Sequence, residues 1–207
     1  MAAGGQLFFS FDGIDGAGKS TQLQRFSRWL EDQGHDVTCC RDPGTTSLGE
    51  QIRQVLLGDH EVPISPTSEM LLYMAARAQL VEEFIRPALD AGKVVIADRY
   101  LLANVVYQGH AGGLDVQALW QVGRIATGDL EPACTFVLDM DPERAKQRRQ
   151  RAADRMERRD ADYFQRVRRG FLTEAQRHPD RIFVINADQE MDQVHREIIA
   201  VAQGVLS

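Results

Sequence analysis

The feature that most constrains the fold is the glycine-rich stretch Gly13–Ser20, GIDGAGKS, which directly follows the apolar run Leu7–Asp12. It fits the pattern G-x-x-x-x-G-K-[ST], in which glycines let the backbone turn tightly and point successive N–H groups at phosphate oxygens. In this pattern the lysine reaches the β- and γ-phosphates and the final hydroxyl binds magnesium. The following helix adds its positive N-terminal end. The stretch therefore predicts a strand, a phosphate-binding loop and a helix, in that order.

Short apolar runs alternate with longer amphipathic segments along the rest of the chain, which is typical of a parallel sheet covered by helices on both faces. The expected strands are Leu7–Asp12, Asp36–Cys40, Val94–Asp98, Thr135–Asp139 and Ile182–Asn186. The expected helices are Thr21–Asp32, Leu48–Leu57, Thr67–Ala88, Val116–Ala126, Glu143–Arg151, Asp162–Arg177 and Met191–Val201. No internal repeat or low-complexity linker divides the 207 residues, so we expect one α/β domain over residues 1–207.

The charge of the chain limits the classes of function. A net charge of −6 argues against a general binder of nucleic acids or membrane surfaces, because the overall field repels polyanions. Eleven of the 24 Lys and Arg residues nevertheless lie between Arg144 and Arg169. Such a basic segment attracts phosphates locally even in an acidic protein.

The cysteines and the apolar runs favour a cytoplasmic protein. Cys39, Cys40 and Cys134 lack metal-ligand spacing and lie in or beside apolar runs, which is typical of free thiols in a reducing compartment. No apolar run approaches the roughly 18 residues of a membrane helix. Residues 1–5, MAAGG, lack the charged and apolar regions of a signal peptide.

Polar residues follow two further expected strands, where the ligands of an open α/β sheet gather. Asp98 ends the apolar run Val94–Ala97 and is placed to hold magnesium or its waters. Arg99, next to it, is placed to bind a second phosphate through two N–H groups. Arg41-Asp42-Pro43-Gly44-Thr45 follows the second strand. A structural ion pair between Asp98 and Arg99 is the alternative, and the glycine-rich loop upstream favours the functional interpretation.

Six motifs resemble those of the thymidylate kinase family in order and spacing. They are Gly13–Thr21, Arg41–Gly44, Leu71–Gln79, Asp98–Tyr100, Ala103–Gly109 and Asp154–Glu157, so the resemblance covers nearly the whole chain. It implies a P-loop α/β fold of three layers, α/β/α, with a five-stranded parallel sheet and a small helical lid at approximately residues 144–160. It also implies transfer of the γ-phosphate of ATP to dTMP, giving dTDP and ADP, with Mg²⁺ as the cofactor.

The resemblance implies which residues bind dTMP. Tyr73 stacks on the thymine ring, and Arg77, on the same helix face, donates to a base carbonyl. Asn104 and Gln108 contact the polar edge of the base, and Tyr107 packs beside the sugar. The full implied set is Asp15, Pro43, Arg53, Tyr73, Arg77, Arg99, Asn104, Tyr107 and Gln108.

The resemblance also implies the ATP, metal and catalytic residues. ATP lies on Gly13, Ile14, Asp15, Gly16, Ala17, Gly18, Lys19, Ser20 and Thr21, with Ala187 near the adenine and magnesium at Ser20 and Asp98. Family members without an arginine inside the phosphate loop carry the catalytic arginine on the lid, and here Gly16 follows Asp15. The implied catalytic residues are Lys19, Asp98, Arg99, Arg149, Arg151 and Arg155.

Two points stay open. Spacing does not choose among Arg148, Arg149 and Arg151 for the arginine at the transferred phosphate. Asp42 stands where the family usually has Glu, and reaching magnesium through a water is one of its open roles.

Other functions compete with this interpretation. A monophosphate kinase of broader or different base specificity has the same loop. A nucleotide-regulated RNA-binding protein would use the basic segment 144–169, but acidic residues interrupt that segment and no aromatic series accompanies it. A catalytically inactive nucleotide sensor is disfavoured because the residues implied for catalysis are present. The resemblance further implies ATP and dTMP as the partners, a homodimer, and no nucleic acid or membrane partner.

Overall fold

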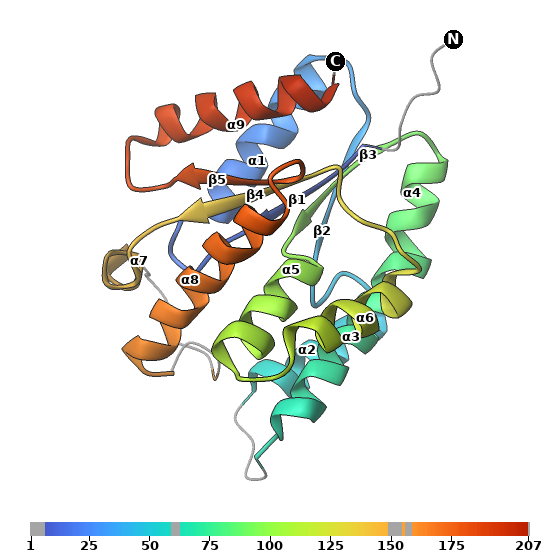
Figure 1. Ribbon diagram of the computed structural model, residues 1–207. Helices are drawn as coiled ribbons and strands as arrows, with labels where there is room; N and C mark the ends of the chain where they lie inside the picture. Colours follow the sequence, from blue (N-terminus) through green and yellow to red (C-terminus); the bar gives the residue numbers. More distant parts are fainter. Residues whose placement is uncertain (1–6, 59–62, 149–154, 156–158, 207) are drawn as a thin grey trace.

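The computed structural model describes residues 7–58, 63–148, 155 and 159–206, and its centre is a five-stranded parallel sheet (Figure 1). The strands are β1 (Phe8–Asp12), β2 (Val37–Arg41), β3 (Val94–Asp98), β4 (Cys134–Asp139) and β5 (Ile182–Asn186). They lie in the order β2-β3-β1-β4-β5, so β1 is central. The expected five-stranded parallel sheet is confirmed, and each strand begins and ends within one residue of its expected bounds.

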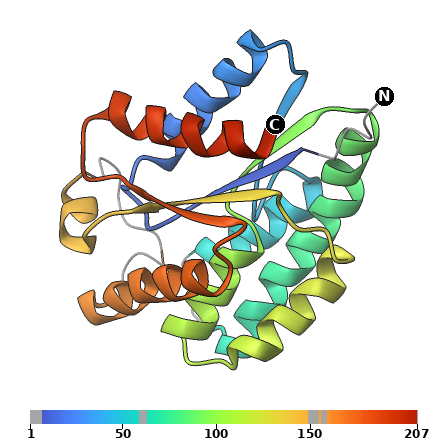
Figure 2. The ribbon, with the colours of Figure 1, turned by 45° about the horizontal axis from the view of Figure 1, so that its top comes forward.

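Helices cover both faces of the sheet and give the expected three layers (Figures 1 and 2). On one face lie α1 (Lys19–Asp32) and α9 (Met191–Leu206), which pack against each other. On the other lie α3 (Pro66–Leu80), α5 (Leu101–Asn104), α6 (Val116–Thr127) and α8 (Ala161–Arg177). The remaining helices are α2 (Ser47–Leu57), α4 (Arg86–Asp90) and α7 (Pro142–Arg148).

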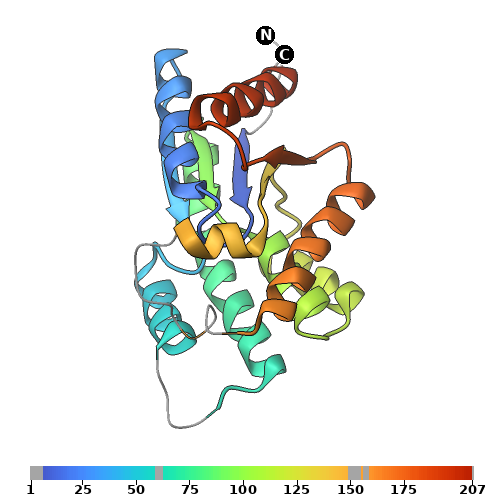
Figure 3. The same ribbon diagram turned by 90° about the vertical axis from the view of Figure 1, so that its left-hand side faces the viewer.

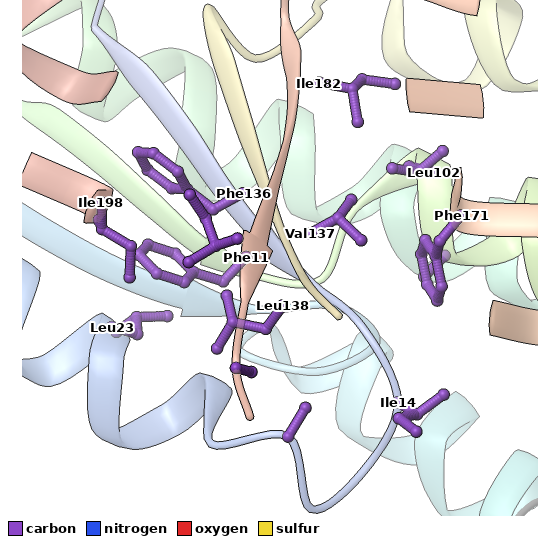
Figure 4. Packing of buried hydrophobic residues seen from close by; sticks show 14 of the residues in the cluster. Phe11, Ile14, Leu23, Leu102, Phe136, Val137, Leu138, Phe171, Ile182 and Ile198 are labelled. Atoms are coloured by element: carbon purple, nitrogen blue, oxygen red, sulfur yellow. The ribbon is translucent and has the colours of Figure 1, made fainter. Parts of the chain in front are cut away.

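β1, β3 and β4 are largely apolar because both of their faces are covered, whereas the edge strands β2 and β5 carry exposed residues. Consecutive residues of β4 show this: Phe136 points toward Phe11 and α9, and Val137 points toward α5 and α8 (Figure 4). The ring of Phe136 lies 5.0 Å from that of Phe11 and 5.4 Å from that of Phe26 on α1. This core fixes the sheet on which the strand ends are displayed.

Two helical regions differ from the expected bounds. The expected helix Thr67–Ala88 is divided into α3, the π-helical turn η1 (Val81–Ile85) and α4, which ends at Asp90. Pro87 lacks a backbone N–H and cannot continue a regular α-helical ladder, which explains the change in hydrogen-bonding pattern before it.

The second difference is a helical segment that was not expected. It consists of α5 and the π-helical turn η2 (Val105–Ala111), and nearly all of its residues are buried. A helix buried on all sides lacks the amphipathic period by which surface helices are recognised. For the expected helix Glu143–Arg151, α7 ends at Arg148, and residues 149–151 lie outside the described residues.

The carboxyl ends of the strands meet at one edge of the sheet, and α7 lies beyond that edge (Figure 3). The chain passes from β1 to β2 and β3 on one side and later to β4 and β5 on the other. The connections therefore diverge at β1, and ligands of open α/β sheets bind at such points. None of the described helices combines the length and the apolar character that crossing a membrane requires.

Candidate active site

The phosphate-binding loop joins the central strand β1 to α1. Gly18 has a φ of 93° and immediately precedes α1, so the first N–H groups of that helix face the loop. Gly13 has a φ of 126°, and a side chain there would place its Cβ 2.5 Å from the carbonyl oxygen of Leu138. Glycine is therefore required at both ends of the loop.

Lys19, the first residue of α1, is held inside the mouth of the loop. Its Nζ donates to the carbonyl oxygens of Gly13 and Ile14 at 3.0 Å each, and lies 3.3 Å from Asp15 Oδ1. Burial, together with the neighbouring Arg99, lowers the pKa of Lys19. The ammonium group is thus positioned to exchange these loop oxygens for phosphate oxygens.

A cavity of about 600 Å³ opens in front of the loop, and we call it the loop cavity. Its lining residues are Asp15, Gly16, Gly18, Lys19, Ser20, Thr21, Arg41, Asp42, Arg53, Asp98, Arg99 and Arg148. Ser20 Oγ lies 3.4 Å from Asp98 Oδ2 at the end of β3. These are the oxygen ligands that Mg²⁺ prefers, and Mg²⁺ usually completes its shell with phosphate oxygens and water.

No group of three or more His, Cys, Asp or Glu side chains that could hold a metal ion occurs in the described part of the chain. The Ser20–Asp98 pair offers Mg²⁺ two oxygen ligands.

Arg99, the residue after β3, forms hydrogen bonds with the phosphate-binding loop. Its backbone has a φ of 68°, in the left-handed region that non-glycine residues rarely occupy. Nη1 donates to the Gly13 carbonyl at 3.0 Å and Nη2 to Asp15 Oδ1 at 2.9 Å. Burial alone would raise the pKa of Asp15, but Arg99 and Lys19 outweigh it and hold that pKa well below its usual range. Asp15 therefore stays ionised and holds both cations in place.

A second cavity, which we call the side cavity, adjoins the loop cavity. Its lining residues are Asp15, Asp42, Pro43, Arg53, Leu57, Tyr73, Arg77, Arg99, Ala103, Asn104, Tyr107 and Gln108. Every residue that the sequence implied for dTMP is in this set. The two cavities share Asp15, Asp42, Arg53 and Arg99.

Two arginine side chains and one tyrosine ring lie at the junction of the two cavities. The guanidinium carbon of Arg99 lies 5.1 Å from the ring centre of Tyr107. Arg53 donates to the Pro43 carbonyl at 3.0 Å. Burial lowers the pKa of Arg53. Two arginines and a buried tyrosine ring thus surround the space between the loop and the side cavity.

Asp42 is placed by its contact with Arg77. Arg77 Nε lies 2.5 Å from Asp42 Oδ2, and both side chains are almost completely buried. Burial raises the pKa of Asp42, and Arg77 opposes that rise. Arg77 Nη1 also donates to Asn104 Oδ1 at 3.1 Å. The Asp42 carboxylate is therefore the counter-ion of Arg77, which leaves one oxygen, Oδ1, buried without a hydrogen-bond partner among the described residues.

The arginines considered for the lid lie in different places. Arg149 and Arg151 lie outside the described residues. Arg155 donates from Nε to the Leu56 carbonyl at 2.7 Å and lies 2.5 Å from Glu69 Oε2. Arg148, at the end of α7, lines the loop cavity. Its Nη1 lies 3.3 Å from the carbonyl oxygen of Ala187, the residue implied for adenine.

Two buried carboxylates in this region were missed in the sequence. Glu69, in the first turn of α3, accepts a hydrogen bond from Gln108 Nε2 at 3.0 Å. In the sequence it looks like an ordinary acidic residue at the N-terminus of a helix, so nothing singled it out. Asp12 ends β1, and neither of its carboxylate oxygens has a hydrogen-bond partner within the described ranges. Burial raises the pKa of Asp12 to about 7. Only the strand-end position of Asp12 could have drawn attention to it.

Comparisons with known proteins show which family the whole chain resembles. The profile of a family described as thymidylate kinase matches residues 11–198. A thymidylate kinase of Symbiobacterium thermophilum is 45% identical over 97% of this chain and 94% of that protein. A thymidylate kinase of Thermoanaerobacter sp. is 43% identical over 96% of this chain and 98% of that protein. The crystal structure of thymidylate kinase from Ehrlichia chaffeensis superposes with a TM-score of 0.78 at 31% identity, over 95% of this chain and 98% of that one.

Proposed function

The chain belongs to the thymidylate kinase family and transfers the γ-phosphate of ATP to dTMP, giving dTDP and ADP, and we propose how its residues divide this reaction. The observation that carries the proposal is that the loop cavity and the side cavity meet at Asp15 and Arg99. A phosphoryl donor in the first and a nucleotide acceptor in the second would have their phosphates side by side at that junction.

The donor lies in the loop cavity. The N–H groups at the start of α1 and the Lys19 ammonium group bind the β- and γ-phosphates of ATP. Ser20 and Asp98 hold Mg²⁺. The ion supplies charge neutralisation at the transferred phosphoryl group. Ala187, the residue after β5, lies on the adenine side.

The acceptor lies in the side cavity, with its phosphate on Arg99. Attack by a phosphate oxygen needs no protein nucleophile and no obligatory general base, because the acceptor is already an anion. Arg99 therefore acts by position and charge. Asp15 holds the guanidinium through a 2.9 Å ion pair and faces the sugar. Arg53 and Pro43 close the same end of the cavity.

The base lies deeper, between the helices on that face of the sheet. Tyr73 stacks on the ring, Arg77 donates to a carbonyl oxygen, and Asn104 and Gln108 face the polar edge. Tyr107 packs beside the deoxyribose. The burial of Arg77, Asn104 and Gln108 supports this assignment, because buried polar groups are retained where a ligand or a network uses them.

A basic side chain from the segment that follows β4 stabilises the transferred phosphoryl group. Among the described residues Arg148 is the candidate that lines the loop cavity. Arg149 and Arg151 remain candidates, and a role for Arg155 at the phosphates requires it to leave its contact with Glu69. From membership of the family we also propose a lid over approximately residues 144–160 and a single domain over residues 1–207. On the same ground we propose a homodimer and a cytoplasmic location.

The experiment is a measurement of ADP release by the purified protein with Mg-ATP and a panel of acceptors, namely dTMP, dUMP, UMP, CMP, AMP and GMP. The expected result is a strong preference for dTMP in the wild-type protein, and loss of turnover in the Arg99→Ala protein while its far-ultraviolet circular dichroism is unchanged. Preference for another monophosphate would overturn the assignment of the side cavity to thymine. Unchanged turnover by Arg99→Ala would overturn the role of Arg99.

A further inference from the structure

A continuous chain of hydrogen bonds crosses the wall of the side cavity. Arg77 Nη1 donates to Asn104 Oδ1 at 3.1 Å, and Asn104 Nδ2 donates to Gln108 Oε1 at 2.7 Å. Gln108 Nε2 then donates to Glu69 Oε1 at 3.0 Å. All four residues are at most 3% exposed, so each depends on its neighbours for hydrogen-bond partners.

The two ends of this chain fix its direction. A guanidinium group has only donors, and an ionised carboxylate has only acceptors. With Arg77 at one end and Glu69 at the other, each amide between them has one orientation in which every contact joins a donor to an acceptor. Flipping the Gln108 amide would place its oxygen against the Glu69 carboxylate and its NH₂ against the NH₂ of Asn104.

Both charged ends are neutralised within the protein. Asp42 Oδ2 lies 2.5 Å from Arg77 Nε. At the other end Glu69 Oε2 lies 2.5 Å from Arg155 Nη2 and 3.8 Å from Arg159 Nη2. Both arginines contact Oε2 of Glu69, which leaves Oε1 as the acceptor for Gln108 and fits the polarity of the chain.

The fixed polarity determines what the cavity offers to a base. Arg77 lines the cavity, and its hydrogen bonds within the protein use four of its five N–H groups, which leaves one on Nη2 for a ligand. Asn104 Oδ1, next to it, keeps a second lone pair for a ring N–H. This pattern fits a base edge with a carbonyl oxygen beside an N–H group, as in thymine. Cytosine carries an amino group and an unprotonated ring nitrogen at those two places, so both contacts would be mismatched.

We propose that Glu69, which does not line the side cavity, is a positioning residue that sets base selection by holding Gln108 and, through it, Asn104. The proposal rests on the assignment of the side cavity to the acceptor base. A purely structural role is the competing explanation, because Glu69 lies in the first turn of α3 and an acid there stabilises the positive end of a helix. Kinetics separate the two explanations.

The experiment compares Glu69→Ala and Glu69→Gln with wild type, using Mg-ATP and either dTMP or dCMP. In Glu69→Ala the buried Gln108 amide loses its acceptor, so the KM for dTMP rises about tenfold while the KM for ATP stays within about twofold. The kcat/KM for dCMP changes little, because dCMP does not use these contacts. The ratio of kcat/KM for dTMP to kcat/KM for dCMP therefore falls about tenfold. Glu69→Gln keeps an oxygen for Gln108 and recovers most of the dTMP affinity.

Two controls make the outcome decisive. Glu83→Ala removes an exposed acid on η1 and should leave all constants unchanged. Gln108→Ala raises the KM for dTMP by itself, and adding Glu69→Ala to it should change the KM less than twofold, because Glu69 acts through Gln108.

The results that overturn the inference are distinct from those that overturn the assignment of the cavity. An unchanged dTMP KM in Glu69→Ala, with only a lower melting temperature, would leave Glu69 a structural role alone. Equal effects of Glu69→Ala in the wild-type and Gln108→Ala backgrounds would also overturn the inference. If Gln108→Ala itself leaves the dTMP KM unchanged in an active enzyme, the assignment of the cavity to the base is wrong.

Discussion

Replacing Asp42 by alanine tests whether this carboxylate is the counter-ion of Arg77 or reaches magnesium through a water. The structure places Asp42 Oδ2 2.5 Å from Arg77 Nε, with side chains 0% and 2% exposed. Removing one member of such a pair leaves a buried, unpaired charge, which costs about 3–5 kcal/mol. Arg77 keeps its contacts with Asn104 Oδ1 and the Tyr100 carbonyl, so we expect the lower end, ~3 kcal/mol.

The assay is thermal unfolding of the ligand-free protein in EDTA. For a chain of this size 1 kcal/mol lowers the melting temperature by about 2–4 °C, so the expected fall is about 6–12 °C. The exposed pair Arg41–Glu50, with a 2.8 Å separation, provides the matched control. Glu50→Gln should cost less than about 1 kcal/mol.

The double variant Asp42→Ala/Arg77→Met completes the test. Because it leaves no unpaired charge, it should be more stable than Asp42→Ala alone. An unchanged melting temperature in Asp42→Ala, together with a raised Mg²⁺ requirement for turnover, would refute the counter-ion assignment and favour the magnesium role.

Three further predictions concern the loop and the strand ends. Lys19→Ala should lower kcat about 10²–10³-fold in a folded protein, as expected when one donor to a developing charge is lost; near-normal turnover would contradict the role of Lys19. Asp98→Asn should raise the Mg²⁺ concentration needed for half-maximal turnover and leave the KM for dTMP within about twofold. Asp12→Asn should flatten the pH dependence of stability in metal-free buffer. Burial raises the pKa of Asp12 from 3.8 to about 7. The unfolded chain releases this proton at lower pH than the folded one, so this group lowers stability as pH rises between about 4 and 7, by up to about 4 kcal/mol. Urea denaturation at pH 5 and pH 8 measures the difference, and equal pH slopes in both proteins would contradict the prediction.

The sequence predicted the sheet and the loop because both depend on short-range patterns. Val94–Asp98 is a run of apolar residues that ends in a carboxylate, and the strand has those bounds in the structure. Gly13 and Gly18 require positive φ angles that few other residues adopt, so the turn is encoded locally. By contrast the buried segment of α5 and η2 has no amphipathic period, and its helical structure comes from packing.

The residues of the side cavity could be predicted only through their resemblance to a family. Tyr73, Arg77, Asn104 and Gln108 have ordinary explanations as core or surface side chains when taken singly. The structure brings them together from α3, α5 and η2. Their binding roles stay predictions until the acceptor panel and the variants are measured.

The sequence alone predicted the strand–loop–helix unit, the positions of the five strands along the chain and the pair Asp98–Arg99 at a strand end. Tertiary structure decided the partners of the buried charges. Asp42 meets Arg77 across 35 residues, Glu69 meets Gln108 across 39, and Glu69 meets Arg155 across 86. Local patterns carry no information about such contacts, because burial and pairing of a charge depend on what the rest of the chain packs against it.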